Sequence, residues 1–198
     1  MVAAAGELFL DRGYTATSLR DVAAIAGVAR PTVAAAFGSK PALLRQVLDE
    51  ALAGDDEPVP VADRPWFAPV WRATRPREVL DAYATVCLLV AQRAARLFEV
   101  VRRASGESAE IAQLWDTLCR NRRAGAEMAV RKVRETGSLR DGLTVERAVV
   151  SVWIFNDPAL YHSLVLDRGW PEADYRDWIA ERMNTALLED PTGGATGT

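Results

Sequence analysis

The chain has 198 residues, with 24 basic and 27 acidic side chains and a formal net charge of −3. This length is sufficient to bury a core, as one large domain or as two small ones. Hydrophobic residues make up 49% of the chain, but no uninterrupted apolar run reaches the roughly 18 residues that a membrane span needs. Glu7 and Asp11 interrupt the short apolar start, which argues against a signal peptide. We therefore expect a cytoplasmic protein without a membrane partner.

The charge distribution and the cysteine content limit the kinds of functional site that the chain can form. Residues 1–54 carry five basic and five acidic side chains, so DNA recognition there would depend on which side chains face the phosphates. Cys87 and Cys119 are too few and too isolated for a disulfide framework or a zinc site. The chain has neither a glycine-rich phosphate loop nor paired Cys/His spacing. We expect no metal, no cofactor and no enzymatic activity.

The N-terminal third of the chain begins with two predicted helices. The first covers about residues 2–11 and ends at Gly13. The second begins after Ser18, because the spacing of Ser18 and Asp21 predicts a capping box in which the two residues satisfy each other's backbone amides. Gly27 follows this helix directly, where a left-handed residue ends it.

A third helix completes this N-terminal group. It begins near Arg30 with Pro31 in its first turn, where the missing amide hydrogen does little harm. Val33 and Phe37 are its expected buried positions. Helix, glycine turn and helix at this spacing predict a helix-turn-helix, whose second helix enters the DNA major groove. The alternative is an ordinary helical hairpin within a bundle.

The remaining chain is also predicted to be helical, since no segment alternates with a period of two. Residues 54–76 contain five prolines and are predicted to form a linker or loop. The helical patterns cover residues 40–53, 78–104, 108–135, a helix capped by Thr144 and continuing to 155, and a last helix after Pro171. The helix over 148–155 is nearly all apolar, so both of its faces should be covered.

These elements predict an all-α protein with two folded parts. The N-terminal part is a three-helix helix-turn-helix unit, and the C-terminal part is a larger helical domain for ligand binding and dimerisation. The predicted boundaries are 1–53 for the DNA-binding domain with its linking helix from 40, 54–76 for the linker, 77–188 for the second domain and 189–198 for a disordered tail.

The N-terminal part resembles the TetR family of bacterial regulators. Three segments carry this resemblance: Ala4–Tyr14, which is similar to the family's first helix and its Gly-Tyr exit, Thr17–Val28, and Phe37-Gly38-Ser39-Lys40. Arg168-Gly169-Trp170 is similar to the closing region of many members. The resemblance implies a homodimer that binds a double-stranded DNA operator and responds to a small molecule.

The resemblance also implies roles for individual residues at the DNA. Arg20 and Arg30 would read guanine edges, because guanidinium groups form bidentate hydrogen bonds there. Thr32 would contact a phosphate or a thymine methyl group, and Thr17 and Lys40 would hold phosphates. The full implied DNA-binding set is Thr17, Ser18, Arg20, Arg30, Pro31, Thr32, Ala34, Ala35 and Lys40. The run Ala34–Ala36 departs from the family, which often has an aromatic residue at the first of these positions and His or Tyr at the third.

Two further sets of residues are candidates in the C-terminal part. Aromatic residues there would either line an apolar effector pocket or form core. Pro158 would leave the carbonyl near Ile154 without a partner, and the polar residues before it would either satisfy the break or face a ligand. The candidate effector set is Trp66, Phe98, Trp115, Cys119, Trp153, Asn156, Asp157 and Tyr161.

The last helix has an apolar stripe that would be either intramolecular core or a dimer interface. An isologous dimer would supply the second cover that the preceding helix needs. The candidate interface is Trp153, Leu160, Leu164, Tyr175, Trp178, Ile179, Arg182, Met183 and Leu187. We therefore expect a homodimeric repressor that a small hydrophobic or aromatic effector releases from a palindromic operator. The alternative is a ligand-binding module of the same fold with weakened or lost DNA recognition.

Overall fold

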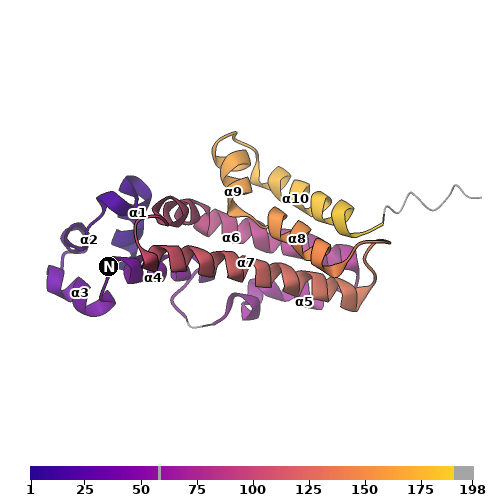
Figure 1. The fold of residues 1–198 in the computed structure, drawn as a ribbon, viewed down its shortest axis with the longest axis horizontal. Helices are drawn as coiled ribbons and strands as arrows, with labels where there is room; N and C mark the ends of the chain where they lie inside the picture. Colours follow the sequence, from indigo (N-terminus) through magenta and orange to yellow (C-terminus); the bar gives the residue numbers. More distant parts are fainter. Residues whose placement is uncertain (58, 190–198) are drawn as a thin grey trace, which may run out of the picture. The chain divides into compact units, whose positions relative to one another are not determined.

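The computed structural model describes residues 1–57 and 59–189. Of the tail predicted at 189–198, residues 190–198 lie outside the described residues. Every regular element in these ranges is helical, as the sequence predicts. The α-helices are labelled in Figure 1, from α1 at the N-terminus to α10. Their bounds are α1 Val2–Ala16, α2 Leu19–Ile25, α3 Arg30–Phe37, α4 Lys40–Ala53, α5 Ala68–Arg72, α6 Pro76–Ala104, α7 Ala109–Thr136, α8 Val145–Phe155, α9 Pro158–Tyr161 and α10 Glu172–Leu187.

Three shorter elements lie between these helices. Two 3₁₀ turns, η1 Val61–Asp63 and η2 Pro65–Phe67, precede α5, so the predicted linker is more structured than expected. The apolar side chains of Phe67 and Val70 in this segment are buried. A π-helical turn, η3 His162–Leu166, continues from α9.

The described chain divides into two compact units. Of the described residues, those in Met1–Val59 and Arg93–Cys119 form the N-terminal unit, and those in Pro60–Gln92 and 120–189 form the C-terminal unit. The division falls within α6 and α7, so it differs from the sequence-based division, which placed both helices in the second domain. Each long helix therefore contributes one part to each unit.

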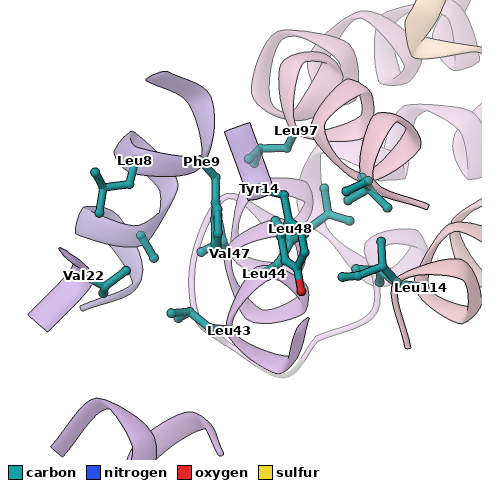
Figure 2. Packing of buried hydrophobic residues seen from close by; sticks show 14 of the residues in the cluster. Leu8, Phe9, Tyr14, Val22, Leu43, Leu44, Val47, Leu48, Leu97 and Leu114 are labelled. Carbon is teal, nitrogen blue, oxygen red and sulfur yellow. The ribbon is translucent and has the colours of Figure 1, made fainter. Parts of the chain in front are cut away.

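The N-terminal unit has a continuous apolar core. Figure 2 shows Leu8 and Phe9 of α1, Val47 and Leu48 of α4, and Leu97 of α6 among its packed side chains. Phe9, Leu48 and their neighbours Leu43 and Leu44 are completely buried. This core fixes α2 and α3 through α1 and α4, which pack against each other.

The sequence predicts that the first helix ends at Gly13, whereas in the structure Gly13 interrupts α1 without ending it. Its φ of 78° and ψ of 174° are non-helical, but helical turns resume and carry α1 on to Ala16. Tyr14 then enters the core and stacks on Phe9, with 6.0 Å between their ring centroids. A residue with a side chain would be strained at this positive φ.

In the C-terminal unit, α10 packs on α8. The α8–η3 segment Val145–Leu166 has 22 residues, and its most apolar 18-residue stretch has a mean hydropathy of 1.2, so the segment could cross a membrane by length and composition alone. The segment is not one uninterrupted helix, since Asn156 ends α8 and Asp157 caps α9. Only 22% of its most apolar stretch is buried, which leaves an apolar surface on this unit.

Candidate DNA-binding site

The start of α2 is fixed by a reciprocal capping box, as predicted. Ser18 Oγ accepts a hydrogen bond of 3.2 Å from the Asp21 amide, and the Asp21 carboxylate accepts one of 3.0 Å from the Ser18 amide. The hydroxyl of Ser18 also donates to this carboxylate at 2.6 Å. These hydrogen bonds from Ser18 lower the pKa of Asp21. The cap holds the N-terminus of α2 in place, and Gly27 (φ 66°) supplies the left-handed turn to α3.

Thr17 does not offer its hydroxyl to a phosphate, which corrects the role that the resemblance implied. The side chain is buried, with 1% exposure. Its Oγ1 donates to the carbonyl of Gly13 at 2.8 Å and lies 3.2 Å from that of Leu8. Thr17 therefore ties the end of α1 together, and this makes its role structural.

The side chain of Lys40 also contacts the protein itself more than the resemblance implied. Its Nζ donates to the carbonyls of Tyr14 and Thr17 at 2.9 and 3.0 Å and lies 4.0 Å from the centroid of the Tyr14 ring. Burial lowers the pKa of Lys40, and the charge of Glu107 opposes this shift. Because an ammonium group has three donors, one N–H is left for a further acceptor.

Arg20 and Arg30 lie beside Lys40 around a shallow depression of about 380 Å³. Its lining residues are Thr15, Thr17, Ser18, Leu19, Arg20, Arg30 and Lys40. Three of these carry a positive charge and none carries a negative one. Both arginines are exposed, and neither forms an ion pair among residues 1–57 and 59–189. A depression with this charge suits an anion such as a DNA phosphate.

The exposed side of α3 continues from this depression. Val33 is completely buried and Phe37 is half-buried, so they attach α3 to the core. Pro31, Thr32 and Ala35 on the other side are exposed, whereas Ala34 is half-buried. The N-terminus of α3 also carries the positive end of the helix dipole. A short capped helix, a glycine turn and an exposed second helix with flanking arginines define a helix-turn-helix DNA-binding protein.

Comparison with known proteins gives a family match for the N-terminal part of the chain. Residues 1–47 match the model of the bacterial regulatory proteins of the tetR family. No curated protein sequence matches the chain. The match covers the part of the chain that contains α1 to α3 and the start of α4, so this part is similar to the DNA-binding domain of TetR-family transcriptional regulators.

Solved structures share the fold over nearly the whole chain. A putative transcriptional regulator from Saccharomonospora viridis, in complex with choline, is 19% identical, with a TM-score of 0.72 and coverage of 96% of both chains. FadR from Bacillus subtilis, in complex with stearoyl-CoA, is 18% identical, with a TM-score of 0.72 and coverage of 93% of this chain and 96% of that one. NalD from Pseudomonas aeruginosa, a repressor of a multidrug efflux pump, is 21% identical, with a TM-score of 0.68 and coverage of 96% and 95%.

The predicted effector residues do not lie together in one unit. Phe98 and Trp115 pack in or against the core of the N-terminal unit, where they serve as core residues. Cys119 also belongs to that unit. The remaining members lie in the C-terminal unit, and these are Trp66, Trp153, Asn156, Asp157 and Tyr161.

Arg122 organises the break between α8 and α9, a role that the sequence did not reveal. Its Nε donates to Asn156 Oδ1 at 3.3 Å, and its Nη2 donates to the Trp153 carbonyl at 2.9 Å and pairs with Asp157 Oδ2 at 2.9 Å. Asn156 Nδ2 donates in turn to Tyr83 Oη at 3.1 Å. The Arg122 side chain is only 10% exposed, so these polar residues stabilise the break itself.

The carbonyl at the break is not left without a partner, which corrects a further expectation. The Asp157 amide donates to the Ile154 carbonyl at 3.2 Å. The Asp157 side chain caps α9 by accepting from the Ala159 amide at 2.9 Å. Pro158 therefore begins a new helix instead of kinking one.

The predicted dimer residues divide into two groups. Four of them are completely or almost completely buried within the protomer: Tyr175, Ile179, Met183 and Leu187. These four are therefore core residues of the protomer and have no surface left for a partner subunit. Five members remain half-exposed: Trp153, Leu160, Leu164, Trp178 and Arg182. Ile154 and Leu166, which the sequence reading did not include, are 50% and 44% exposed.

Proposed function

We propose that this protein is a homodimeric repressor that binds a palindromic operator and is released by a small apolar effector. The observation that carries this proposal is the depression at the end of α1 and the starts of α2, α3 and α4, where Arg20, Arg30 and Lys40 lie beside the exposed side of α3. One recognition helix of eight residues contacts few bases. Two copies on successive major grooves, about 34 Å apart, would supply the affinity of a regulator.

The apolar surface of the C-terminal unit supports the dimer. Phe155 packs edge-to-face on Trp178, and Trp170 does the same from another side, each with 6.2 Å between ring centroids. All three rings stay partly exposed, and Ile154 and Leu166 extend the same apolar segment. Exposed apolar surface of this kind is typical of protein interfaces. A two-fold dimer through α8, η3 and α10 would cover it.

The effector site belongs, in this proposal, to the C-terminal unit near the α8–α9 break. Trp66, Trp153 and Tyr161 would supply apolar contacts, and Asn156 and Asp157 would orient the ligand. Arg122 would join them, since any ligand that displaced Asp157 from its guanidinium would change how α7 holds α8. The neighbours bound to choline and stearoyl-CoA show that this fold accepts small molecules.

The signal would reach the DNA through helices that both units share. Arg93 of α6 donates to the Ala53 carbonyl at the end of α4, at 3.1 Å. A change in α6 would thus shift α4, which begins at Lys40 beside the depression. A coupling of about 1 to 3 kcal/mol would alter DNA affinity roughly 5- to 150-fold.

Selection from a random duplex library tests the function. The purified protein should enrich an inverted repeat whose half-site centres lie about one DNA turn apart. Failure to enrich any sequence would reject the regulator and favour the ligand-binding module with lost DNA recognition, for which the alanine run of α3 is the supporting observation. Apolar compounds, including stearoyl-CoA, would then be screened by thermal shift, and a compound that binds without changing DNA affinity would count against the coupling.

A further inference from the structure

The outward face of α3 carries only short side chains. Val33 and Phe37 take the buried side, and the residues that face away from them are Pro31, Thr32, Ala35 and Ala36. All four are exposed. Beyond the Thr32 hydroxyl, this face consists of methyl groups and the proline ring.

The long polar side chains of the site lie at the edge of this face. Arg30 begins α3, and Arg20 comes from the first turn of α2. Both reach the depression beside the helix N-terminus, and neither is held by an ion pair in the described part of the chain. Guanidinium contacts are therefore confined to one end of α3, and the second helical turn has no hydrogen-bond donor of its own to offer.

A methyl surface can recognise one feature of the major groove. Thymine is the base that presents an apolar group there, its 5-methyl, whereas the other groove edges present hydrogen-bond donors and acceptors. Alanine and the threonine methyl make apolar contact with this group. Short side chains also allow the α3 backbone to lie close to the bases, which such a contact requires.

We propose that Ala35 and Ala36, which lie beside Thr32 on the outward face of α3, recognise thymine 5-methyl groups in the operator, with Arg20 and Arg30 anchoring the adjacent bases or phosphates. This inference rests on the proposed function, since it assigns what the same DNA-binding face reads. Each half-site then contains one or two thymines whose methyl groups, and not only their hydrogen-bonding edges, determine affinity.

Replacement of single thymines by deoxyuridine tests this directly, because it removes the methyl group and keeps the base pairing. The full-length protein would be titrated against the duplex selected above, with one thymine replaced at a time. Loss of one buried methyl contact corresponds to roughly four-fold weaker binding. We expect this effect at one or two positions per half-site and no change at thymines outside the half-sites.

Variants of the helix test the protein side of the contact. Ala35→Gly and Ala36→Gly remove the methyl groups that would touch thymine. In these variants, replacing the matching thymine by deoxyuridine should no longer change the DNA affinity. Ala24→Gly, at an exposed position of α2, is the matched control for the loss of helix propensity. Circular dichroism melting would establish that each variant is folded at the titration temperature.

The outcomes separate this inference from the function on which it rests. Specific binding in which no deoxyuridine substitution weakens affinity would overturn methyl recognition and leave the regulator in place, with sequence read through DNA shape. A deoxyuridine effect that persists unchanged in both glycine variants would also overturn it. Failure to select any sequence would instead reject the proposed function.

Discussion

Lys40 lies over the ring of Tyr14, with 4.0 Å between its Nζ and the ring centroid, and donates a hydrogen bond to the carbonyl of the same residue. This pair joins the first residue of α4 to the end of α1. The resemblance to other regulators points to a phosphate contact for this lysine, but its position shows that two of its three donors serve the fold.

Replacing Lys40 should therefore reduce stability as well as DNA affinity. Lys40→Met removes the hydrogen bonds to the Tyr14 and Thr17 carbonyls, and we expect a loss of about 1 to 2 kcal/mol in the free energy of unfolding. Urea unfolding followed by circular dichroism measures it. Arg45→Met removes an exposed charge from the same helix and should change stability by less than about 0.5 kcal/mol. Equal effects of the two variants would contradict the structural role.

Thr17 should affect stability without directly affecting DNA binding. Thr17→Val keeps the shape of the side chain but removes the hydroxyl that bonds to the Gly13 carbonyl, so unfolding should become easier by about 1 to 2 kcal/mol. Thr185→Val, at an exposed position of α10, is the control. At a temperature where both variants are folded, DNA affinity should stay within about two-fold of the original. A larger loss of DNA affinity with Thr17→Val would instead support a contact between Thr17 and a DNA phosphate.

Arg122 and Arg123 are neighbours in sequence, but we expect their replacement to reduce stability by different amounts. Arg122→Met removes the partner of Asp157 and leaves the Trp153 carbonyl and Asn156 Oδ1 without their donor. Because the pair is largely buried on the arginine side, we expect a loss of about 2 to 3 kcal/mol. The Arg123 side chain is 42% exposed and pairs with Glu127 and Glu146, so Arg123→Met should cost at most about 1 kcal/mol. Thermal and urea unfolding of both variants would compare them, and similar losses would refute the assignment.

The proposed dimer can be tested through its exposed apolar surface. Leu164→Glu and Trp178→Glu place a charge where the partner would bury it, so sedimentation velocity should show a shift from dimer to monomer. Leu10→Glu, at a 38% exposed position of α1, is the control and should leave the oligomeric state unchanged. A dimer that persists in both interface variants would require another interface.

The sequence predicted the elements whose signals are local. The Ser18–Asp21 box, the left-handed Gly27 and the start of α4 at Lys40 all depend on residues within a few positions of one another, and the structure confirms them. Local capping and turn chemistry were therefore enough to define the helix-turn-helix.

Features that depend on distant residues were missed or left open. Arg122 lies in a run of arginines, and no neighbouring residue marks it as different from them, because its partner Asp157 comes 35 positions later and follows a helix break. The stripe on α10 fits core and interface equally well by its period, and only packing against α8 decides that Ile179 and Met183 are core. The division of α6 and α7 between two units has no local signal at all.

Fluorescence anisotropy with the selected duplex tests the central claim most directly. The wild type and the variants Arg30→Ala and Arg45→Ala would be titrated at several salt concentrations, with unrelated DNA as competitor. We expect specific binding that weakens as salt rises, a loss of at least ten-fold with Arg30→Ala and little change with Arg45→Ala. Equal affinity for the selected and unrelated duplexes, or equal effects of the two substitutions, would contradict DNA recognition by α3.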